Sequence, residues 1–160
     1  MDFQTPPKIC EYMVSLLPKR RGIKKILEPT PGQGNLVQEL RNKKFEVYYP
    51  KKDFWKIGIE CYDAVVMNPP FSPMKQGYDI LYRCMEVTDV IIALMPWLTI
   101  INSEQRTEDI FKFGLVSVTH LPRSVFPGSR VQTCILKMDH HYCNITEFCT
   151  LDHNYWGKND

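Results

Sequence analysis

The residues best suited to chemistry are Asn68-Pro69-Pro70-Phe71, which directly follow the apolar run Ala64–Met67. Two consecutive prolines fix the backbone and hold the residues before them in an extended conformation. The Asn68 side-chain oxygen and the adjacent backbone carbonyl can therefore point at one spot as paired hydrogen-bond acceptors. The aromatic ring of Phe71 stands beside them. This arrangement suits an exocyclic amino group on a flat ring, because two acceptors match its two hydrogens and the ring gains a stacking partner.

A second candidate site is the turn Glu28-Pro29-Thr30-Pro31-Gly32-Gln33-Gly34, which lies between an expected strand and an expected helix. Glycines at such a turn let backbone N–H groups approach a ligand closely. In doubly wound sheets, nucleoside cofactors bind at this place, beyond the carboxyl ends of the strands. Val37 stands where the pattern G-x-G-x-x-G requires its third glycine, so the turn disfavours NAD and FAD.

The elements that must position these two turns alternate between helix and strand. Apolar residues at helical spacing predict a first helix that begins at Thr5-Pro6-Pro7, with Thr5 as its cap, and is closed by Lys19–Gly22. Strands are expected at Ile26-Leu27, Phe45–Tyr49, Tyr62–Met67, Val90–Leu94, Leu115–Leu121 and Val131–Met138, and further helices at Asn35–Arg41, at Lys75–Met85 and from Ser103-Glu104 onward. This alternation predicts an α/β fold with a mainly parallel sheet. The last two strands, joined through Pro127-Gly128, are predicted to form an antiparallel edge hairpin.

The composition is that of an ordinary globular domain. The chain has 160 residues, of which 44% are hydrophobic and 24% are charged, and this excludes a disordered or fibrous protein. The longest apolar run, Val90–Leu98, is far shorter than the ~20 residues that span a bilayer. The N-terminus has no signal-peptide pattern. We therefore expect one intracellular domain without a membrane partner.

The charge is distributed unevenly along the chain. Residues 1–56 carry a net charge of +6 and the rest carries −4, which gives the overall value of +2. The basic half could face a polyanion, or its lysines and arginines could simply be solvated helix ends and loops. The sequence leaves both interpretations open.

The six cysteines are expected to be free thiols, because no secretion signal is present. Histidines and cysteines crowd the C-terminal stretch at His140, His141, Cys143, Cys149 and His153. A zinc site can have ligands spaced this loosely, but the paired C-x-x-C motif of a zinc knuckle is missing. We therefore expect no metal centre.

Together these motifs resemble the class I S-adenosylmethionine-dependent methyltransferases. Asn68-Pro69-Pro70-Phe71 resembles the catalytic tetrapeptide of amino-group methyltransferases in its DNA N6-adenine form, with Glu28-Pro29 and Gly32-x-Gly34 upstream. Phe3-Gln4-Thr5-Pro6 resembles the N-terminal F-x-T-P motif of these enzymes, and Asp53-Phe54 resembles their D-F motif. Leu121-Pro122-x4-Phe126 and Val131-x-Thr133-x-Ile135-Leu136 resemble the late hairpin motif that lines the target-base pocket. The resemblance covers nearly the whole chain and implies a Rossmann-like fold.

On the substrate side, the resemblance implies methyl transfer to the N6 amino group of adenine in duplex DNA. The adenine must be flipped out of the stack to be reached. Asn68 and the Pro69 carbonyl would accept the two N6 hydrogens, Pro70 would complete the rigid turn, and Phe71 would stack on the base. Phe126 would line the base pocket, and Arg130 is the best candidate for a phosphate contact.

On the cofactor side, the resemblance implies that S-adenosylmethionine is the methyl donor. Its binding residues would be Phe3, Thr5, Glu28, Pro29, Gly32, Gly34, Asp53, Phe54 and Asn68. In this interpretation Thr5 contacts the cofactor carboxylate, and Glu28 supports the loop and the cofactor amino group. Asp53 accepts from the adenine amino group of the cofactor, while Phe54 packs on its ring.

The sequence departs from the family pattern in two respects. The family places an acid at the end of the second strand to bind the ribose hydroxyls, but here Glu46 comes too early. The catalytic core also fills residues 1–160, so no separate target-recognition domain is expected. The enzyme would then methylate with little sequence preference, use a partner protein or a second copy of the chain, or read a very short site with its loops. Minimal enzymes of this kind resemble those of phages and mobile elements, which act in the cytoplasm of a bacterial host.

Two alternatives remain open. The same chemistry could act on RNA adenine or on protein glutamine, although F-x-T-P favours DNA adenine and Phe71 favours a nucleobase. Alternatively, the chain could be a degenerate cofactor-binding or DNA-binding module that assists another methyltransferase. The missing ribose acid motivates this second alternative.

Overall fold

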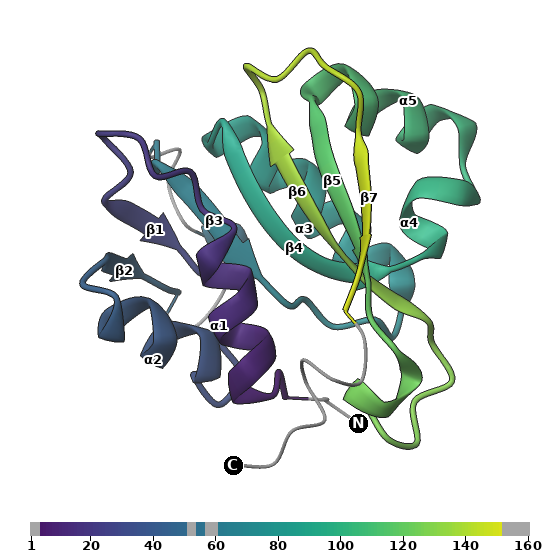
Figure 1. Cartoon of the computed structure of the whole chain (residues 1–160), viewed down its shortest axis with the longest axis horizontal. Helices are drawn as coiled ribbons and strands as arrows, with labels where there is room; N and C mark the ends of the chain where they lie inside the picture. The colour runs from purple at the N-terminus through teal and green to yellow at the C-terminus, as the bar shows by residue number, and fades with distance from the viewer. Residues whose placement is uncertain (1–3, 51–53, 57–60, 152–160) are drawn as a thin grey trace.

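A seven-stranded sheet in the order β2-β1-β3-β4-β6-β5-β7 forms the centre of the computed structural model, which describes residues 4–50, 54–56 and 61–151 (Figure 1). Its strands are β1 (Lys25–Leu27), β2 (Glu46–Tyr48), β3 (Ala64–Met67), β4 (Val90–Pro96), β5 (Leu115–His120), β6 (Thr133–Asp139) and β7 (Glu147–Thr150). β6 runs antiparallel to both of its neighbours, whereas the remaining pairs are parallel. The predicted α/β fold with a mainly parallel sheet is confirmed.

Helices cover both faces of the sheet. The helices are α1 (Pro7–Ser15), α2 (Asn35–Asn42), α3 (Met74–Val87), α4 (Leu98–Ile101) and α5 (Glu104–Phe113), with short 3-10 turns η1 (Phe54–Lys56) and η2 (Arg123–Val125). Residues of α1 and α2 belong to one core cluster, and residues of α3 and α5 belong to the other. Because each cluster takes alternate residues of the central strands, every residue of β3 and β4 is buried.

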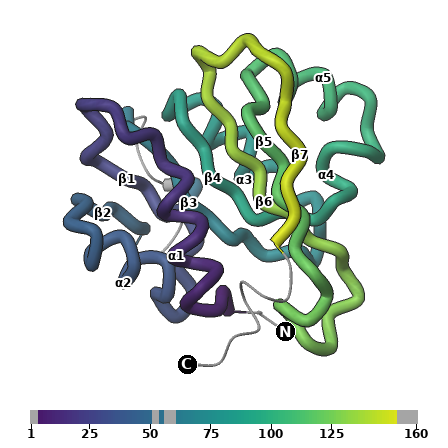
Figure 2. The backbone as a smooth tube through the Cα atoms, in the orientation of Figure 1, coloured from purple at the N-terminus to yellow at the C-terminus, as the bar shows by residue number. Residues whose placement is uncertain are grey.

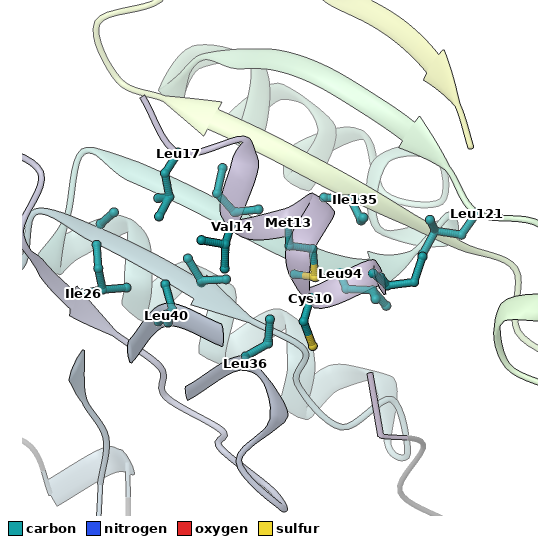
Figure 3. Packing of buried hydrophobic residues seen from close by; sticks show 14 of the residues in the cluster. Cys10, Met13, Val14, Leu17, Ile26, Leu36, Leu40, Leu94, Leu121 and Ile135 are labelled. Carbon is teal, nitrogen blue, oxygen red and sulfur yellow. The ribbon is translucent and has the colours of Figure 1, made fainter. Parts of the chain in front are cut away.

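The apolar spacing along α1 explains how the first cluster is built. Cys10, Met13 and Val14 recur at helical intervals along α1, Leu17 follows just after the helix ends, and all four are labelled in the core cluster of Figure 3. They pack against residues of β1, β4 and β6 that are almost fully buried. The helix is thereby held across the sheet, and the residues just before it are placed at the carboxyl ends of the strands.

The path of the chain brings distant segments to one edge of the sheet. Figure 2 shows β1 and β2 on one side, β3 and β4 in the centre, and β5 to β7 on the other side. Since β1, β3, β4 and β5 point the same way, the turns after them lie at a common edge. The start of α1 and the loop between β5 and β6 lie on that same lower side of the molecule in Figure 1.

Three local features differ from the sequence-based expectation. Thr5 does not cap α1, because the N-cap is Pro6 and no side chain caps this helix. The β5–β6 hairpin is antiparallel as expected but lies one strand inside the sheet, since β7 pairs with β5. The short helix α4 is an addition between β4 and α5.

The described residues contain neither a membrane-spanning helix nor a cluster of metal ligands. None of the helices in this part of the chain has the length and apolar character needed to cross a membrane. Within the same ranges, no group of three His, Cys, Asp or Glu side chains is arranged to hold a metal ion. His140 and His141 instead contact the Phe113 carbonyl and the Asp89 carboxylate.

Candidate functional site

A cavity of about 970 Å³ lies at the carboxyl edge of the sheet. Described residues of five chain segments line it: the residues before α1, the turn after β1 with the start of α2, Pro50 and Phe54 after β2, the turn after β3, and the loop between β5 and β6. The residues with a predicted role that line it are Thr5, Glu28, Pro29, Gly32, Phe54, Asn68, Pro69, Pro70, Phe71, Phe126 and Arg130. The volume is typical of a small-molecule site, for which ~300–1,000 Å³ is usual. Residues spread over most of the sequence are thus brought together around one space.

The remaining predicted site residues lie elsewhere. Gly34 does not line the cavity; it is the N-cap of α2, with φ of 90°, and its N–H donates to the Pro31 carbonyl at 2.7 Å. A positive φ is costly for residues with a side chain, so this glycine shapes the turn. Phe3 and Asp53 lie outside the described residues.

The turn after β3 is held from two sides. The Asn68 amide nitrogen Nδ2 donates to Oγ1 of Thr5 at 2.8 Å. On the other side, α3 packs so closely that a Cβ added to Gly77 would lie 3.0 Å from the Pro70 carbonyl oxygen. Phe71 is half-buried and packs against the core cluster of α1 and α2. The Asn-Pro-Pro-Phe turn is therefore a supported structure rather than a loose loop.

The segment before α1 connects the two candidate turns. The Thr5 carbonyl accepts hydrogen bonds from Asn35 Nδ2 at 2.9 Å and from Cys10 Sγ at 3.5 Å. Gln4 Oε1 accepts from the Gln33 N–H at 3.2 Å and lies against Gly32. Sequence reasoning missed Gln4 and Asn35. The only sequence signals were their positions, inside the F-x-T-P motif and at the first residue of α2.

Glu28 is a buried acid at the end of β1, with 1% of its surface exposed. Its carboxylate oxygen Oε1 accepts from Thr30 N at 2.7 Å and from Thr30 Oγ1 at 3.4 Å. Burial raises the pKa of Glu28 to about 8, although the hydrogen bonds from Thr30 act in the opposite direction. In the protein alone, the side chain is therefore mostly protonated at neutral pH, and a neighbouring cation would favour its ionised form.

The lining fits a nucleoside cofactor that carries a positive charge. Leu36, Pro50 and Phe54 give one wall of the cavity an apolar surface, which suits a purine ring. Among the described residues, Glu28 is the one acid in the lining, and a buried carboxylate suits an ammonium or sulfonium group. Glu46 is the first residue of β2, accepts from the Tyr48 hydroxyl and does not line the cavity. Among the residues that the structure describes, no acid follows β2 at the edge of the cavity.

The loop between β5 and β6 forms the outer part of the cavity. Phe126 is 6% exposed, whereas Arg130 is exposed to solvent at the rim. The Ser129 hydroxyl accepts from the Val131 N–H at 3.2 Å and so shapes the loop beside Arg130. Phe126 thus belongs to the core cluster of α1 and α2 as well as to the lining of the cavity.

Comparison with known proteins shows which solved structures share this fold. No protein-family model matches the sequence, and a search of curated proteins also finds no match. Solved structures do match. The methyltransferase subunit of a type I restriction-modification system from Streptococcus thermophilus is 15% identical, with a TM-score of 0.71 over 93% of this chain and 47% of that chain. A protein of Listeria monocytogenes named as a class I S-adenosylmethionine-dependent methyltransferase is 14% identical, with a TM-score of 0.70 over 96% and 68%.

The chain has the class I methyltransferase fold. A third solved structure, the 23S rRNA methyltransferase ErmE, is 18% identical, with a TM-score of 0.58 over 86% of this chain and 69% of that chain. The methyltransferase fold therefore matches proteins named for DNA modification systems and for RNA modification. The chain spans about half the length of the type I subunit that it matches.

Proposed function

We propose that the protein transfers a methyl group from S-adenosylmethionine to the N6 amino group of adenine in DNA. The observation that carries this proposal is the position of Asn68 and Pro69. They follow β3 at the carboxyl edge and line the same cavity as the glycine turn and the buried Glu28. A pair of acceptors thus lies next to the place where this fold binds a nucleoside cofactor.

The paired acceptors address the main chemical difficulty of the reaction. The lone pair of adenine N6 is delocalised into the ring, which makes the nitrogen a poor nucleophile. Asn68 Oδ1 and the Pro69 carbonyl would each accept one N6 hydrogen and favour a localised lone pair on N6. The lone pair would form the new bond to the methyl carbon, the carbon–sulfur bond would break with its electrons left on sulfur, and N6 would then give one proton to water. Positioning therefore supplies most of the catalysis.

The base itself would be held by the aromatic residues of the cavity. Phe71 would stack on the flipped adenine, and stacking of this kind contributes ~1–3 kcal/mol per base. Phe126 would close the pocket, and Arg130 at the rim would contact the backbone phosphate. Recognition of a DNA sequence would come from a very short site, a partner protein or a second copy of the chain.

S-adenosylmethionine would supply an activated methyl group on a sulfonium, which is a good leaving group. Glu28 and the backbone at Gly32 would hold its charged methionine end, while Pro50 and Phe54 would pack on its adenosine end. Phe3 and Asp53 stay predicted contacts. The F-x-T-P resemblance likewise predicts that Thr5 contacts the cofactor carboxylate.

The test is transfer of labelled methyl groups to unmethylated duplex DNA, RNA and protein. We expect N6-methyladenine in DNA and loss of at least ~100-fold in rate for Asn68→Ala, because removing one preorganised polar partner of the reacting group costs about that much. Asn144→Ala is the matched control, since Asn144 is an exposed asparagine in the turn before β7. Label that enters only RNA or only protein would contradict the DNA assignment.

A second measurement separates an enzyme from a cofactor-free module. We expect titration calorimetry to detect binding of S-adenosylmethionine and of its demethylated product. If neither binds, methyl transfer is excluded and the chain is better explained as a DNA-binding or partner-binding module. Cofactor binding without transfer to any substrate would also contradict the proposed activity.

A further inference from the structure

The Thr5 side chain is used in a way that its sequence context does not suggest. Its hydroxyl oxygen accepts the amide hydrogen of Asn68, a residue 63 positions later, at 2.8 Å. Thr5 is 4% exposed, and the hydrogen bond is part-buried at the wall of the cavity. The helix that follows Thr5 has no side-chain cap, so capping does not explain the residue.

The Thr5 backbone is itself held by both flanking helices. Its carbonyl accepts from Asn35 at the start of α2 and from Cys10 in α1. These bonds use the backbone, so they remain when the side chain is changed. The Thr5 hydroxyl is therefore presented to Asn68 from a fixed position.

The orientation of the Asn68 amide decides whether the proposed chemistry works. The amide nitrogen and oxygen are bonded to the same carbon and point in different directions. A hydrogen bond from Nδ2 to Thr5 therefore directs Oδ1 away from Thr5. An amide turned the other way would present a donor to the substrate amine, which is itself a donor. Only the observed orientation offers an acceptor to the amine.

We infer that Thr5 is a positioning residue, whose hydroxyl holds the Asn68 amide nitrogen so that the amide oxygen faces the methyl-accepting amine. This inference rests on the proposed function, and it assigns Thr5 a role toward the amine that accepts the methyl group. Contact with the cofactor carboxylate would instead assign Thr5 a role in binding the methyl donor. The two roles predict different kinetics.

Kinetics of Thr5→Val and Thr5→Ser distinguish these roles. Valine keeps the shape of threonine but removes the hydroxyl, and serine keeps the hydroxyl. We expect kcat of Thr5→Val to fall about tenfold, the upper end of the effect expected for loss of one hydrogen bond. Its affinity for S-adenosylmethionine by calorimetry should change less than about twofold. Thr5→Ser should recover most of kcat, and Thr150→Val on the exposed edge strand β7 should behave as wild type.

Two kinetic results would overturn the inference. One is a Thr5→Val enzyme with wild-type kcat. The other is a loss confined to cofactor affinity, which would favour contact with the cofactor carboxylate instead.

A spectroscopic readout tests the hydrogen bond without any turnover. In ¹⁵N-labelled protein, the Asn68 side-chain amide pair is assigned by its disappearance in Asn68→Ala. We expect slow solvent exchange of this pair in wild type and Thr5→Ser, and at least about tenfold faster exchange in Thr5→Val. Unchanged exchange in Thr5→Val would overturn the inference even if the enzyme is active. If wild type transfers no methyl group although the amide is protected, the proposed function fails while the Thr5–Asn68 contact stands.

Discussion

Glu28 is the residue whose environment most directly predicts a pH dependence. Its pKa is raised from 4.5 to about 8, chiefly because burial disfavours the charged carboxylate. Between these two values the folded protein holds a proton that the unfolded chain has lost. Stability contributed by the protonated side chain is therefore fully present below about pH 4.5 and is lost as the pH rises through about 8.

We predict that the free energy of unfolding of the wild type falls relative to that of Glu28→Gln as the pH is raised from 5 to 9. Glutamine cannot ionise but keeps an oxygen that accepts from Thr30. The difference should amount to several kcal/mol, at about 1.4 kcal/mol for each pH unit between the two pKa values. Urea unfolding at pH 5, 7 and 9 measures it. A difference that stays constant with pH would contradict the burial of an ionisable Glu28.

Candidate site residues could be proposed from the sequence where they belong to a motif of adjacent residues. Asn68–Phe71, Glu28 and Gly32 belong to such motifs, and the structure places them around one cavity. The supporting contacts could not be predicted in this way. The Thr5–Asn68 and Gln4–Gln33 hydrogen bonds join residues that are far apart in the chain. The need for a glycine at position 77 comes from the Pro70 carbonyl, which leaves little room for a side chain. Such choices depend on the folded geometry and leave no local pattern.

At the scale of elements, α3 acts as a support for the Asn-Pro-Pro-Phe turn. Gly77 is buried on its inner face, and an added methyl group would meet the Pro70 carbonyl oxygen at 3.0 Å and the Pro69 ring at 3.8 Å. Glycine normally weakens a helix interior by about 1 kcal/mol relative to alanine. Its presence here is explained by the close approach of the helix to the turn.

We predict that Gly77→Ala reduces the rate of methyl transfer several-fold while the unfolding temperature stays within a few degrees of wild type. Alanine stabilises the helix relative to glycine, and this gain offsets the stability lost through the tight contact. The Pro70 carbonyl must nevertheless shift by a few tenths of an ångström. Gln76→Ala is the control, because Gln76 is the exposed neighbour on the same helix. Transfer by Gly77→Ala at the same rate as by Gln76→Ala would show that the turn tolerates the added methyl group.

Helices and strands could be predicted where burial of one face requires apolar residues at regular spacing. Elements without such spacing were missed. The buried strands and the helices α2, α3 and α5 follow from apolar spacing and from caps such as Ser103, whose side chain accepts from the Arg106 N–H. β7 was missed because it is an edge strand with little burial, and its Phe148 is 69% exposed. The four-residue helix α4 is too short to show a period. Thr5 was wrongly predicted to cap α1, since its hydroxyl is used by Asn68 instead.

At the scale of the whole molecule, the basic residues divide between opposite edges of the sheet. The run Lys19–Lys25 leads into the start of β1, while the cavity lies beyond the end of that strand. Asp63 binds the Lys24 and Lys25 backbone amides at 3.0 and 2.7 Å, and Arg20 pairs with Asp139 at 2.7 Å. The interpretation of this run as a solvated and structural loop is therefore favoured over a polyanion-binding surface. Among the described residues that line the cavity, Arg130 is the one cation, and the proposed function assigns it the phosphate contact.

We predict that Arg130→Ala weakens binding to duplex DNA and lowers the slope of log K against log salt concentration by about one, as expected when one phosphate contact is lost. Arg21→Ala is the matched control, because Arg21 is also an exposed arginine and lies at the opposite edge of the sheet. It should leave both the affinity and the slope unchanged. Fluorescence anisotropy with labelled duplexes between 50 and 200 mM salt covers the range in which such contacts change the affinity most. A larger effect for Arg21→Ala than for Arg130→Ala would move the DNA-binding surface away from the cavity, and the flipped-base geometry proposed for Asn68 and Phe71 would then have no duplex beside it.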